Sequence, residues 1–242
     1  MTLLDYPGFT ACTVFVAGCD FACPFCQNAS LIRQRDSSSV LRYRDCPSVI
    51  YDFLKTRQGL LDGVCISGGE PLLQDGLESF IDKVKELGFL VKIDTNGSNP
   101  GKLKKLIESG KIDFVAMDIK NSPEKYAQTI GLPNYDIARV EESISLLLAN
   151  PIPFEFRTTV VKEFHTEEDL LSIARWISGA YTQVISDAKS PQVSGDIRYF
   201  LQKFIDSDNV KQKGLHSYSD KEMHHLVEVV KSVVPSAELR GV

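Results

Sequence analysis

Short apolar runs alternate with amphipathic stretches along most of the chain. Runs of β-branched and aromatic residues between turn residues predict strands at 11–17, 63–67, 89–94, 113–118, 154–161, 198–202 and 237–240. Helical periodicity predicts helices over 48–61, 77–87, 102–109, 137–149, 166–177 and 219–233, and Ser122-Pro123 is typical of another helix start. Strands that alternate with helices pair in parallel through right-handed crossovers. The pattern therefore predicts an α/β fold, a partial (β/α)6 barrel of the TIM type with parallel strands.

Two helix starts and one irregular segment refine this prediction. Thr166 with Asp169, and Ser219 with Glu222, have the spacing of capping boxes. Residues 179–197 are polar and contain Ser190-Pro191, so we expect a surface loop there.

Composition places the chain among ordinary globular proteins. It has 242 residues, 43% of them hydrophobic, and a formal net charge of −5, so we expect a single domain over residues 1–242. The acidic balance argues against a nucleic-acid partner. No apolar run approaches the ~20 residues of a membrane span, and the first residues lack the pattern of a signal peptide. Six cysteines without an export signal then favour a cytoplasmic protein that uses them for metal or redox chemistry.

Three of the cysteines stand close together after the first predicted strand. Cys19, Cys23 and Cys26 are spaced by four and then three residues. Cysteine thiolates hold iron–sulfur clusters, and three of them can hold three irons of a cubane while the fourth iron is left without a protein ligand. An iron of that kind can bind and reduce a small molecule. Phe25 would offer an apolar face beside the last cysteine.

Polar motifs follow the next three predicted strands. Ser67-Gly68-Gly69-Glu70-Pro71, Asp94-Thr95-Asn96-Gly97 and Asp118-Ile119-Lys120 each stand at a carboxyl end. In parallel β/α folds these ends share one face, where active sites lie. We therefore expect these motifs and the cysteine loop to converge.

The chemistry of these motifs suits a zwitterion attached to a nucleoside. Gly68 and Gly69 permit close backbone approach, and Glu70 supplies an anion for an ammonium group. Asp94 and Asp118 can accept hydrogen bonds from ribose hydroxyls or from the ammonium, and Lys120 can pair with a carboxylate.

The fifth predicted strand carries charge on one face. Phe154 and Phe156 alternate with Glu155 and Arg157, which is a period-two pattern. If the charged face points into the barrel, Arg157 contacts either the ligand or an acidic neighbour.

With these motifs assembled, the chain resembles the radical S-adenosylmethionine (radical SAM) enzymes over nearly its full length. Within them it is similar to the glycyl-radical-enzyme activases, through LDYPG at 4–8, CPFCQN at 23–28, DTNG at 94–97 and MDIK at 117–120. RTTVV at 157–161 and ELRGV at 238–242 are similar to the activating proteins of anaerobic ribonucleoside-triphosphate reductase.

The resemblance implies a set of cofactors, site residues and partners. Cys19, Cys23 and Cys26 would ligate a [4Fe-4S] cluster whose open iron binds S-adenosylmethionine. The cofactor-binding set would be Phe25, Gly68, Gly69, Glu70, Asp94, Asn96, Asp118, Lys120 and Arg157. Reductive cleavage would give a 5′-deoxyadenosyl radical that takes hydrogen from a glycine of a partner enzyme, with flavodoxin or ferredoxin as an electron donor and no nucleic acid or membrane involved.

Several alternatives remain open from the residues. The cysteines could form a zinc site, although no fourth ligand stands nearby, because Cys12 lies inside a strand and His165 is remote in sequence. Cys23-Pro24-Phe25-Cys26 also has the spacing of a thiol–disulfide or electron-transfer protein. A radical SAM enzyme with a small-molecule substrate is a third possibility. We expect His165 at the surface or in a cap, and Cys12 and Cys65 in the core.

Overall fold

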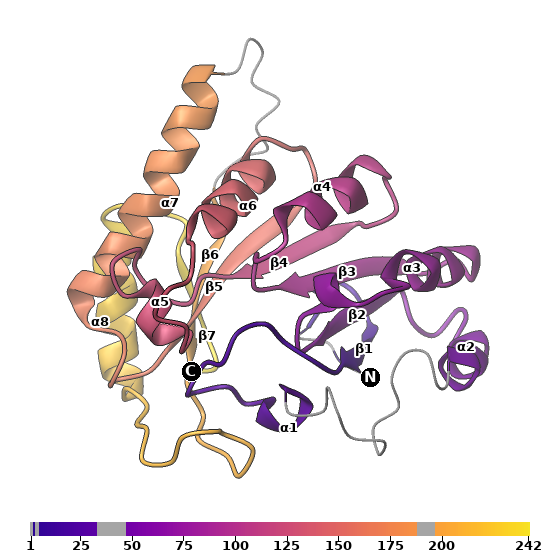
Figure 1. The fold of residues 1–242 in the computed structure, drawn as a ribbon, viewed down its shortest axis with the longest axis horizontal. Helices are drawn as coiled ribbons and strands as arrows, with labels where there is room; N and C mark the ends of the chain where they lie inside the picture. The colour runs from indigo at the N-terminus through magenta and orange to yellow at the C-terminus, as the bar shows by residue number, and fades with distance from the viewer. Residues whose placement is uncertain (1, 3–4, 33–46, 188–196) are drawn as a thin grey trace. The chain divides into compact units, whose positions relative to one another are not determined.

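The computed structural model describes residues 2, 5–32, 47–187 and 197–242 (Figure 1). In chain order its elements are β1 (Ala11–Val16), α1 (Ala29–Ile32), α2 (Pro47–Lys55), β2 (Gly63–Gly68), a 3-10 turn (Pro71–Leu73), α3 (Leu77–Glu86), β3 (Leu90–Thr95), α4 (Pro100–Glu108), β4 (Phe114–Asp118), α5 (Tyr126–Thr129), α6 (Ala138–Leu148), β5 (Phe154–Val160), α7 (Glu167–Asp187), β6 (Tyr199–Lys203), α8 (Asp220–Lys231) and β7 (Glu238–Arg240).

The chain forms two compact units. Unit 1 comprises Met1–Asp20, Ser30–Thr95 and Gly101–Ala116, and unit 2 comprises Phe21–Ala29, Asn96–Pro100 and Met117–Val242. Strand β4 belongs to both, and the strand order β1-β2-β3-β4-β5-β6-β7 follows the chain. This order and the parallel pairings confirm the predicted α/β class with parallel strands, the arrangement of a partial (β/α)6 barrel. The single domain over residues 1–242 stays a prediction.

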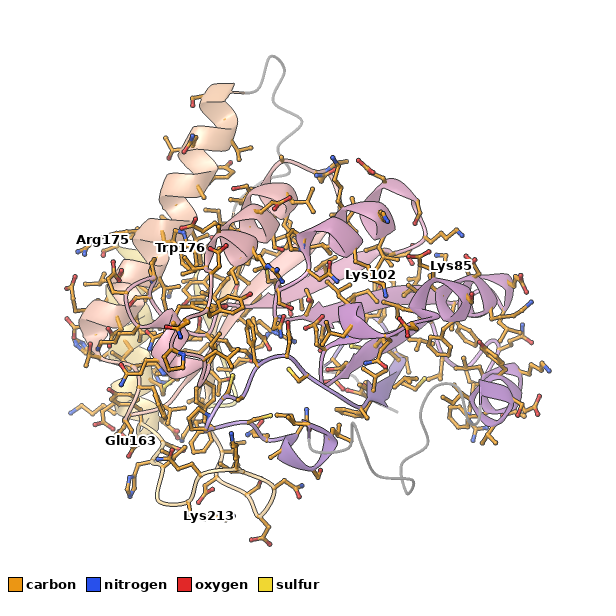
Figure 2. The ribbon with its side chains drawn as sticks, in the orientation of Figure 1. Lys85, Lys102, Glu163, Arg175, Trp176 and Lys213 are labelled. Atoms are coloured by element: carbon orange, nitrogen blue, oxygen red, sulfur yellow. The ribbon has the colours of Figure 1, made fainter. Side chains whose placement is uncertain are left out.

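Unit 1 is built on β1, β2 and β3, which pair in parallel. Val64, Cys65 and Ile66 in β2 have no exposed surface, as in strands covered on both faces. Helix α3 buries Phe80 and Ile81. Lys85 of α3 pairs with Asp113 at 2.8 Å, and that carboxylate also accepts a hydrogen bond from the backbone N–H of Val91 (Figure 2). The entry into β4 is thereby tied to both β3 and α3.

Unit 2 is built on the end of β4 and on β5, β6 and β7. Strand β6 pairs in parallel with β5 and β7, with Arg157 opposite Phe200 and Gln202 opposite Arg240. Helices α7 and α8 pack side by side (Figure 1). Helix α8 begins with the predicted capping box between Ser219 and Glu222. Trp176 of α7 contacts the ring of Tyr126 at 6.0 Å, so its role is packing (Figure 2).

Most predicted elements lie within a few residues of the observed ones, but two helix predictions were wrong in extent. Helix α2 ends at Lys55 rather than residue 61, because the chain turns there and Gly59 adopts φ +77°. The helix expected from Ser122-Pro123 is only the short α5. Helix α1 was not predicted at all.

The expected surface loop over 179–197 is the third correction. Helix α7 continues through Gly179 to Asp187, while residues 188–196 lie outside the described part of the chain. The Thr182 hydroxyl donates to the Ser178 carbonyl at 2.9 Å and the Ser186 hydroxyl to the Gln183 carbonyl at 2.8 Å. These polar side chains bond to the helix itself instead of ending it. Gly179 is not among the glycines with positive φ, so its backbone follows the helix.

Candidate functional site

The loop with the first cysteine is held in unit 1 by the end of β2. Gly18, with φ +87°, precedes Cys19, and its carbonyl accepts a hydrogen bond from the N–H of Glu70 at 2.8 Å. A Cβ at Gly69 would lie 2.0 Å from that carbonyl oxygen. The backbone that approaches Gly69 is therefore that of the cysteine loop, and only glycine fits there. Gly68, with φ +112°, is constrained in the same way by Val16.

Glu70 is buried inside unit 1. Its Oε1 accepts a hydrogen bond from the N–H of Leu72 at 2.9 Å and one from the Thr95 hydroxyl at 2.8 Å, and its side chain has no exposed surface. The carboxylate caps the 3-10 turn that follows the motif and ties it to the end of β3. The Ser67–Pro71 segment is thus rigid, as a binding loop requires.

Asp94 has a buried cationic partner in unit 1. The ammonium of Lys92, without exposed surface, donates to Asp94 Oδ1 and lies 3.8 Å from the Cys65 sulfur. Only 14% of the Asp94 side chain is exposed. Lys92 thus orients the Asp94 carboxylate through a buried ion pair, a role that the sequence pattern did not reveal.

Unit 2 brings Asp118, Lys120 and Arg157 together. Arg157 Nε donates to Asp118 Oδ1 at 2.9 Å, and Lys120 Nζ donates to Asp118 Oδ2 at 3.0 Å. Burial alone would raise the pKa of Asp118, but the two cations outweigh it and hold that pKa well below its usual range. Burial likewise opposes the charge of Lys120, yet Asp118 raises the pKa of Lys120 above its usual range. Asp118 therefore stays ionised and Lys120 protonated near neutral pH.

Cys23, Phe25 and Cys26 also belong to unit 2. All three cysteines of the loop are free thiols. Burial raises the pKa of Cys23 to about 11, while the charge of Lys120 favours its thiolate. Phe25 packs against Phe164 at 5.4 Å between ring centroids and is 4% exposed.

Asn96 shapes the turn after β3. Its Oδ1 accepts a hydrogen bond from the Ser98 N–H at 2.9 Å. Gly97, with φ +75°, lies so close to Met117 that a Cβ there would be 2.1 Å from the methionine methyl carbon. The turn therefore requires glycine.

The stretch after β6 holds the cysteine loop within unit 2, which the sequence did not predict. Gln27 Nε2 donates to the Ile205 carbonyl at 3.0 Å. Lys211 Nζ donates to the Ala22 carbonyl at 3.0 Å, and the N–H of Gln212 donates to the Pro24 carbonyl at 2.9 Å. Ile205, Lys211 and Gln212 belong to no sequence motif, so only the folded chain reveals these contacts.

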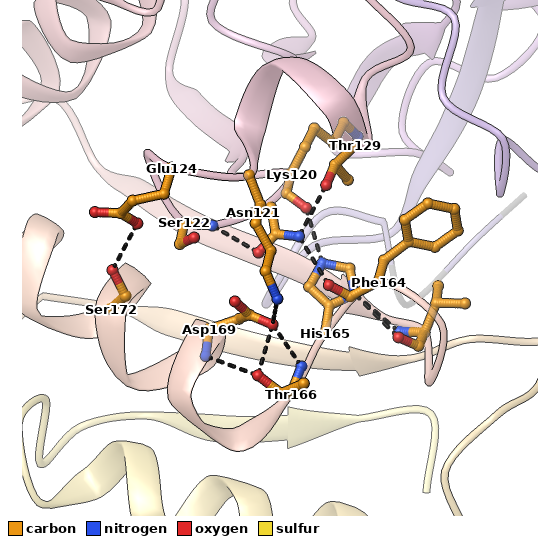
Figure 3. A network of polar contacts seen from close by, with 12 residues as sticks. Lys120, Asn121, Ser122, Glu124, Thr129, Phe164, His165, Thr166, Asp169 and Ser172 are labelled. Carbon is orange, nitrogen blue, oxygen red and sulfur yellow. Dashed lines mark hydrogen bonds and ion pairs between the residues drawn. The ribbon is translucent and has the colours of Figure 1, made fainter. Parts of the chain in front are cut away.

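His165 is buried in unit 2, so its predicted surface position was wrong. Its Nδ1 accepts from the Val161 N–H at 3.1 Å and its Nε2 donates to the Lys120 carbonyl at 2.8 Å (Figure 3). The ring also lies 6.0 Å from that of Phe25. Because both nitrogens are engaged, His165 is no zinc ligand. It instead fixes the backbone of Lys120. Asp169 beside it forms the predicted capping box with Thr166 and pairs with Lys125 at 2.7 Å (Figure 3).

The burial of His165 predicts a pH dependence of stability. Burial lowers its pKa in the folded state, whereas the unfolded value is ~6.5. Its contribution is therefore fully present above pH ~6.5 and is lost as the pH falls toward the folded pKa, by up to ~1.4 kcal/mol per pH unit. We expect His165→Gln to lower the free energy of unfolding by about 1–3 kcal/mol at neutral pH and to remove this acid slope. Urea unfolding of the metal-free protein at several pH values measures both effects. His224→Gln, which changes an exposed histidine, is the matched control. If the free energy of unfolding of His165→Gln depended on pH as in the wild type, His165 would not be the source of this pH dependence.

The donor chemistry of the loop fits an iron–sulfur cluster. Cys19, Cys23 and Cys26 are three free thiols within eight residues of chain, and thiolates are the ligands such clusters take. Elsewhere among the described residues, Cys12 and Cys65 are buried in strands, as predicted. Over residues 2, 5–32, 47–187 and 197–242, no group of three or more His, Cys, Asp or Glu side chains is gathered as a metal site.

Comparisons with known proteins agree with this chemistry. The family model described as "Radical SAM superfamily" matches residues 13–177. A Methanocaldococcus jannaschii protein named as a glycyl-radical enzyme activating enzyme is 28% identical over 250 residues, covering 100% of this chain and 93% of the relative. The pyruvate formate-lyase-activating enzyme of Staphylococcus epidermidis is 26% identical over 186 residues, which cover 74% of this chain and 72% of that enzyme.

Solved structures give the same fold. Streptococcus suis SuiB bound to S-adenosylmethionine superposes with a TM-score of 0.67 at 15% sequence identity, over 96% of this chain. The chain covers 50% of the length of SuiB. Among the described residues no helix is long and apolar enough to cross a membrane.

Proposed function

Because the chain belongs to the radical SAM superfamily, we propose that it activates a glycyl radical enzyme. The observation that carries the proposal is the end-to-end similarity to a relative named as such an activating enzyme, which covers all of this chain. The enzymes of the superfamily use a [4Fe-4S] cluster and S-adenosylmethionine. When bound, the reduced cluster supplies the electron that splits S-adenosylmethionine into methionine and a 5′-deoxyadenosyl radical.

The three loop cysteines are the proposed cluster ligands. Cys23 is buried and its thiol pKa is raised to about 11 by that burial, so metal binding has to displace its proton. The neighbouring charge of Lys120 assists this ionisation. The family membership favours this role over a thioredoxin-type dithiol, which would leave Cys19 unused.

The charged group at the ends of β4 and β5 is the proposed binding site for the charged part of S-adenosylmethionine. Lys120 and Arg157 are cations that flank one carboxylate, an arrangement that matches a carboxylate and an ammonium on one ligand. Asp118 would accept from the ligand ammonium or a ribose hydroxyl.

The remaining cofactor contacts come from the other motifs. Gly68, Gly69 and Glu70 would shape the loop beside the ligand, because the N–H groups of Gly69 and Glu70 already donate to neighbouring backbone carbonyls and the Glu70 carboxylate is buried. Asp94 and Asn96 would bind the ligand hydroxyls. The ring of Phe25 would pack beside the adenine. Each belongs to a segment that glycine turns or buried hydrogen bonds hold in one conformation, as such a site requires.

The substrate would be a glycine in a partner enzyme. Hydrogen-atom transfer from the glycine Cα to the 5′-deoxyadenosyl radical would leave 5′-deoxyadenosine and a glycyl radical on the partner. The motifs at 157–161 and 238–242 support anaerobic ribonucleoside-triphosphate reductase as the partner. A cytoplasmic flavodoxin or ferredoxin would donate the electron, as the resemblance to the activases implies.

The test is radical transfer to a purified partner. The protein is reconstituted with iron and sulfide without oxygen, reduced with dithionite, and mixed with S-adenosylmethionine and either anaerobic ribonucleotide reductase or pyruvate formate-lyase. We expect a glycyl-radical EPR doublet on the reductase, matched by one 5′-deoxyadenosine per radical. The control partner carries alanine at its radical glycine. Formation of 5′-deoxyadenosine with no radical on either partner would contradict the proposal and favour a small-molecule substrate.

A further inference from the structure

A chain of charged side chains runs from the C-terminal strand to Asp118 within unit 2. Arg240 of β7 donates from Nη1 to Glu155 Oε1 at 2.7 Å and from Nη2 to Glu155 Oε2 at 2.6 Å. Glu155 is 1% exposed. A bidentate bond to a buried carboxylate is among the strongest side-chain contacts and fixes direction as well as distance.

The sheet holds this ion pair in place. Arg240 and Glu155 lie on strands that both pair with β6, so their contact spans β6. The guanidinium of Arg240 lies 3.6 Å from the ring centroid of Phe200 on that strand. Stacking on an aromatic ring and a planar fork of donors are properties of arginine that lysine does not share.

Glu155 also faces the second arginine. Arg157 Nη1 lies 4.0 Å from Glu155 Oε1, while Nε of the same guanidinium bonds to Asp118 at 2.9 Å. Arg157 is therefore placed between two carboxylates. Arg240 neutralises Glu155, and this leaves Arg157 directed at Asp118.

We propose that Arg240 and Glu155 are positioning residues for S-adenosylmethionine binding, which act by holding Arg157 against Asp118. The inference rests on the proposed function, in which Asp118 and Arg157 contact the cofactor. Without Arg240, the buried Glu155 carboxylate loses its bidentate partner, and Arg157, whose Nη1 already lies 4.0 Å from Glu155 Oε1, can replace it. Arg157 would then turn toward Glu155, and Asp118 would lose one of its two cationic partners and keep Lys120.

The test measures cofactor affinity in the reconstituted protein. We expect Arg240→Met to raise the Kd for S-adenosylmethionine, measured by calorimetry, and the KM for 5′-deoxyadenosine formation together by roughly tenfold, the size of a typical coupling between contacting residues. The kcat and the iron content should stay near those of the wild type. Lys203→Met is the matched control, since Lys203 on β6 pairs with the exposed Asp220. An unchanged Kd in Arg240→Met would overturn the inference.

A double-mutant cycle separates positioning from general stabilisation. If Arg240 acts through Arg157, adding Arg240→Met to Arg157→Met should cause no further loss of affinity. Fully additive losses would overturn the inference. If Arg240→Met does not fold, Arg240→Lys replaces it, because lysine keeps the positive charge but lacks the planar guanidinium that forms the bidentate bond. A Kd for S-adenosylmethionine equal to that of the wild type in Arg240→Lys would then contradict the inference. A wild-type protein that does not bind S-adenosylmethionine would instead contradict the proposed function.

Discussion

Serine at Cys19, Cys23 or Cys26 is expected to abolish reductive cleavage of S-adenosylmethionine in each variant separately. A cubane held at three corners loses one of only three protein ligands, and a hydroxyl is a poor substitute for a thiolate at iron. We expect 5′-deoxyadenosine formation to fall by at least about a hundredfold, which exceeds the usual effect of losing an outer hydrogen bond to a metal ligand. Iron and sulfide analysis after anaerobic reconstitution measures the loss of the cluster. Formation of 5′-deoxyadenosine under dithionite measures the loss of cleavage.

The control for these variants is Cys12→Ala. Cys12 is also a buried free cysteine, 7% exposed in β1, so it reports the cost of changing a cysteine without touching the loop. It should keep its full iron content. A loop variant that retained four irons and full turnover would remove that cysteine from the ligand set, and retention in all three would contradict the cluster itself.

The fold was predictable because each strand carries its own local signal. Apolar runs such as 63–67, bounded by glycines and aspartates, require no knowledge of distant residues, and strand order then follows from right-handed crossovers. The length of α7 was not predictable in this way. Its last turns contain Gly179 and several hydroxyl side chains, which are typical of a loop in sequence, although two of those hydroxyls bond to carbonyls of the helix itself.

The ends of strands revealed the candidate site residues, but not their partners. Asp118 and Lys120 form one motif, so their proximity is local. Arg157 of the next strand was expected to meet either the ligand or an acid, and its contact with Asp118 confirms the acidic neighbour. Glu155 and Arg240, by contrast, are separated by 85 residues. Their contact depends on the register of β5, β6 and β7, which no pattern within a single strand encodes.

Buried polar residues were the least predictable class. The sequence gives no sign that Lys92 and His165 are buried, because each stands among residues that are polar or alternate in character. Both are buried because a neighbour satisfies them: Asp94 neutralises Lys92, and two backbone groups occupy the nitrogens of His165. Burial of such groups costs free energy unless these partners exist, so it can be inferred only once the fold has brought them together.

Asp118→Asn is expected to raise the KM for S-adenosylmethionine by about thirty- to a hundredfold, equivalent to ~2–3 kcal/mol, while iron content stays unchanged. Asparagine keeps the shape of the side chain but leaves Lys120 and Arg157 without their shared counter-charge, and removing one partner of a buried charge pair is costly. Two uncompensated cations would attract the ligand carboxylate, yet repel the ammonium that Asp118 is proposed to bind. The loss of affinity therefore measures the ammonium contact.

The pH profile and a matched variant make this prediction specific. Because Arg157 and Lys120 hold the pKa of Asp118 well below its usual range, the wild-type KM should not rise on acidification from pH 7 to 5 through protonation of this carboxyl. The control is Asp136→Asn, which changes an exposed aspartate that caps the start of α6 and should leave the KM unaltered. Equal loss of iron and affinity in Asp118→Asn would assign Asp118 a structural role in the cysteine loop instead. Lost affinity with retained iron separates the binding of the cofactor from the assembly of the cluster, because the two then depend on different side chains.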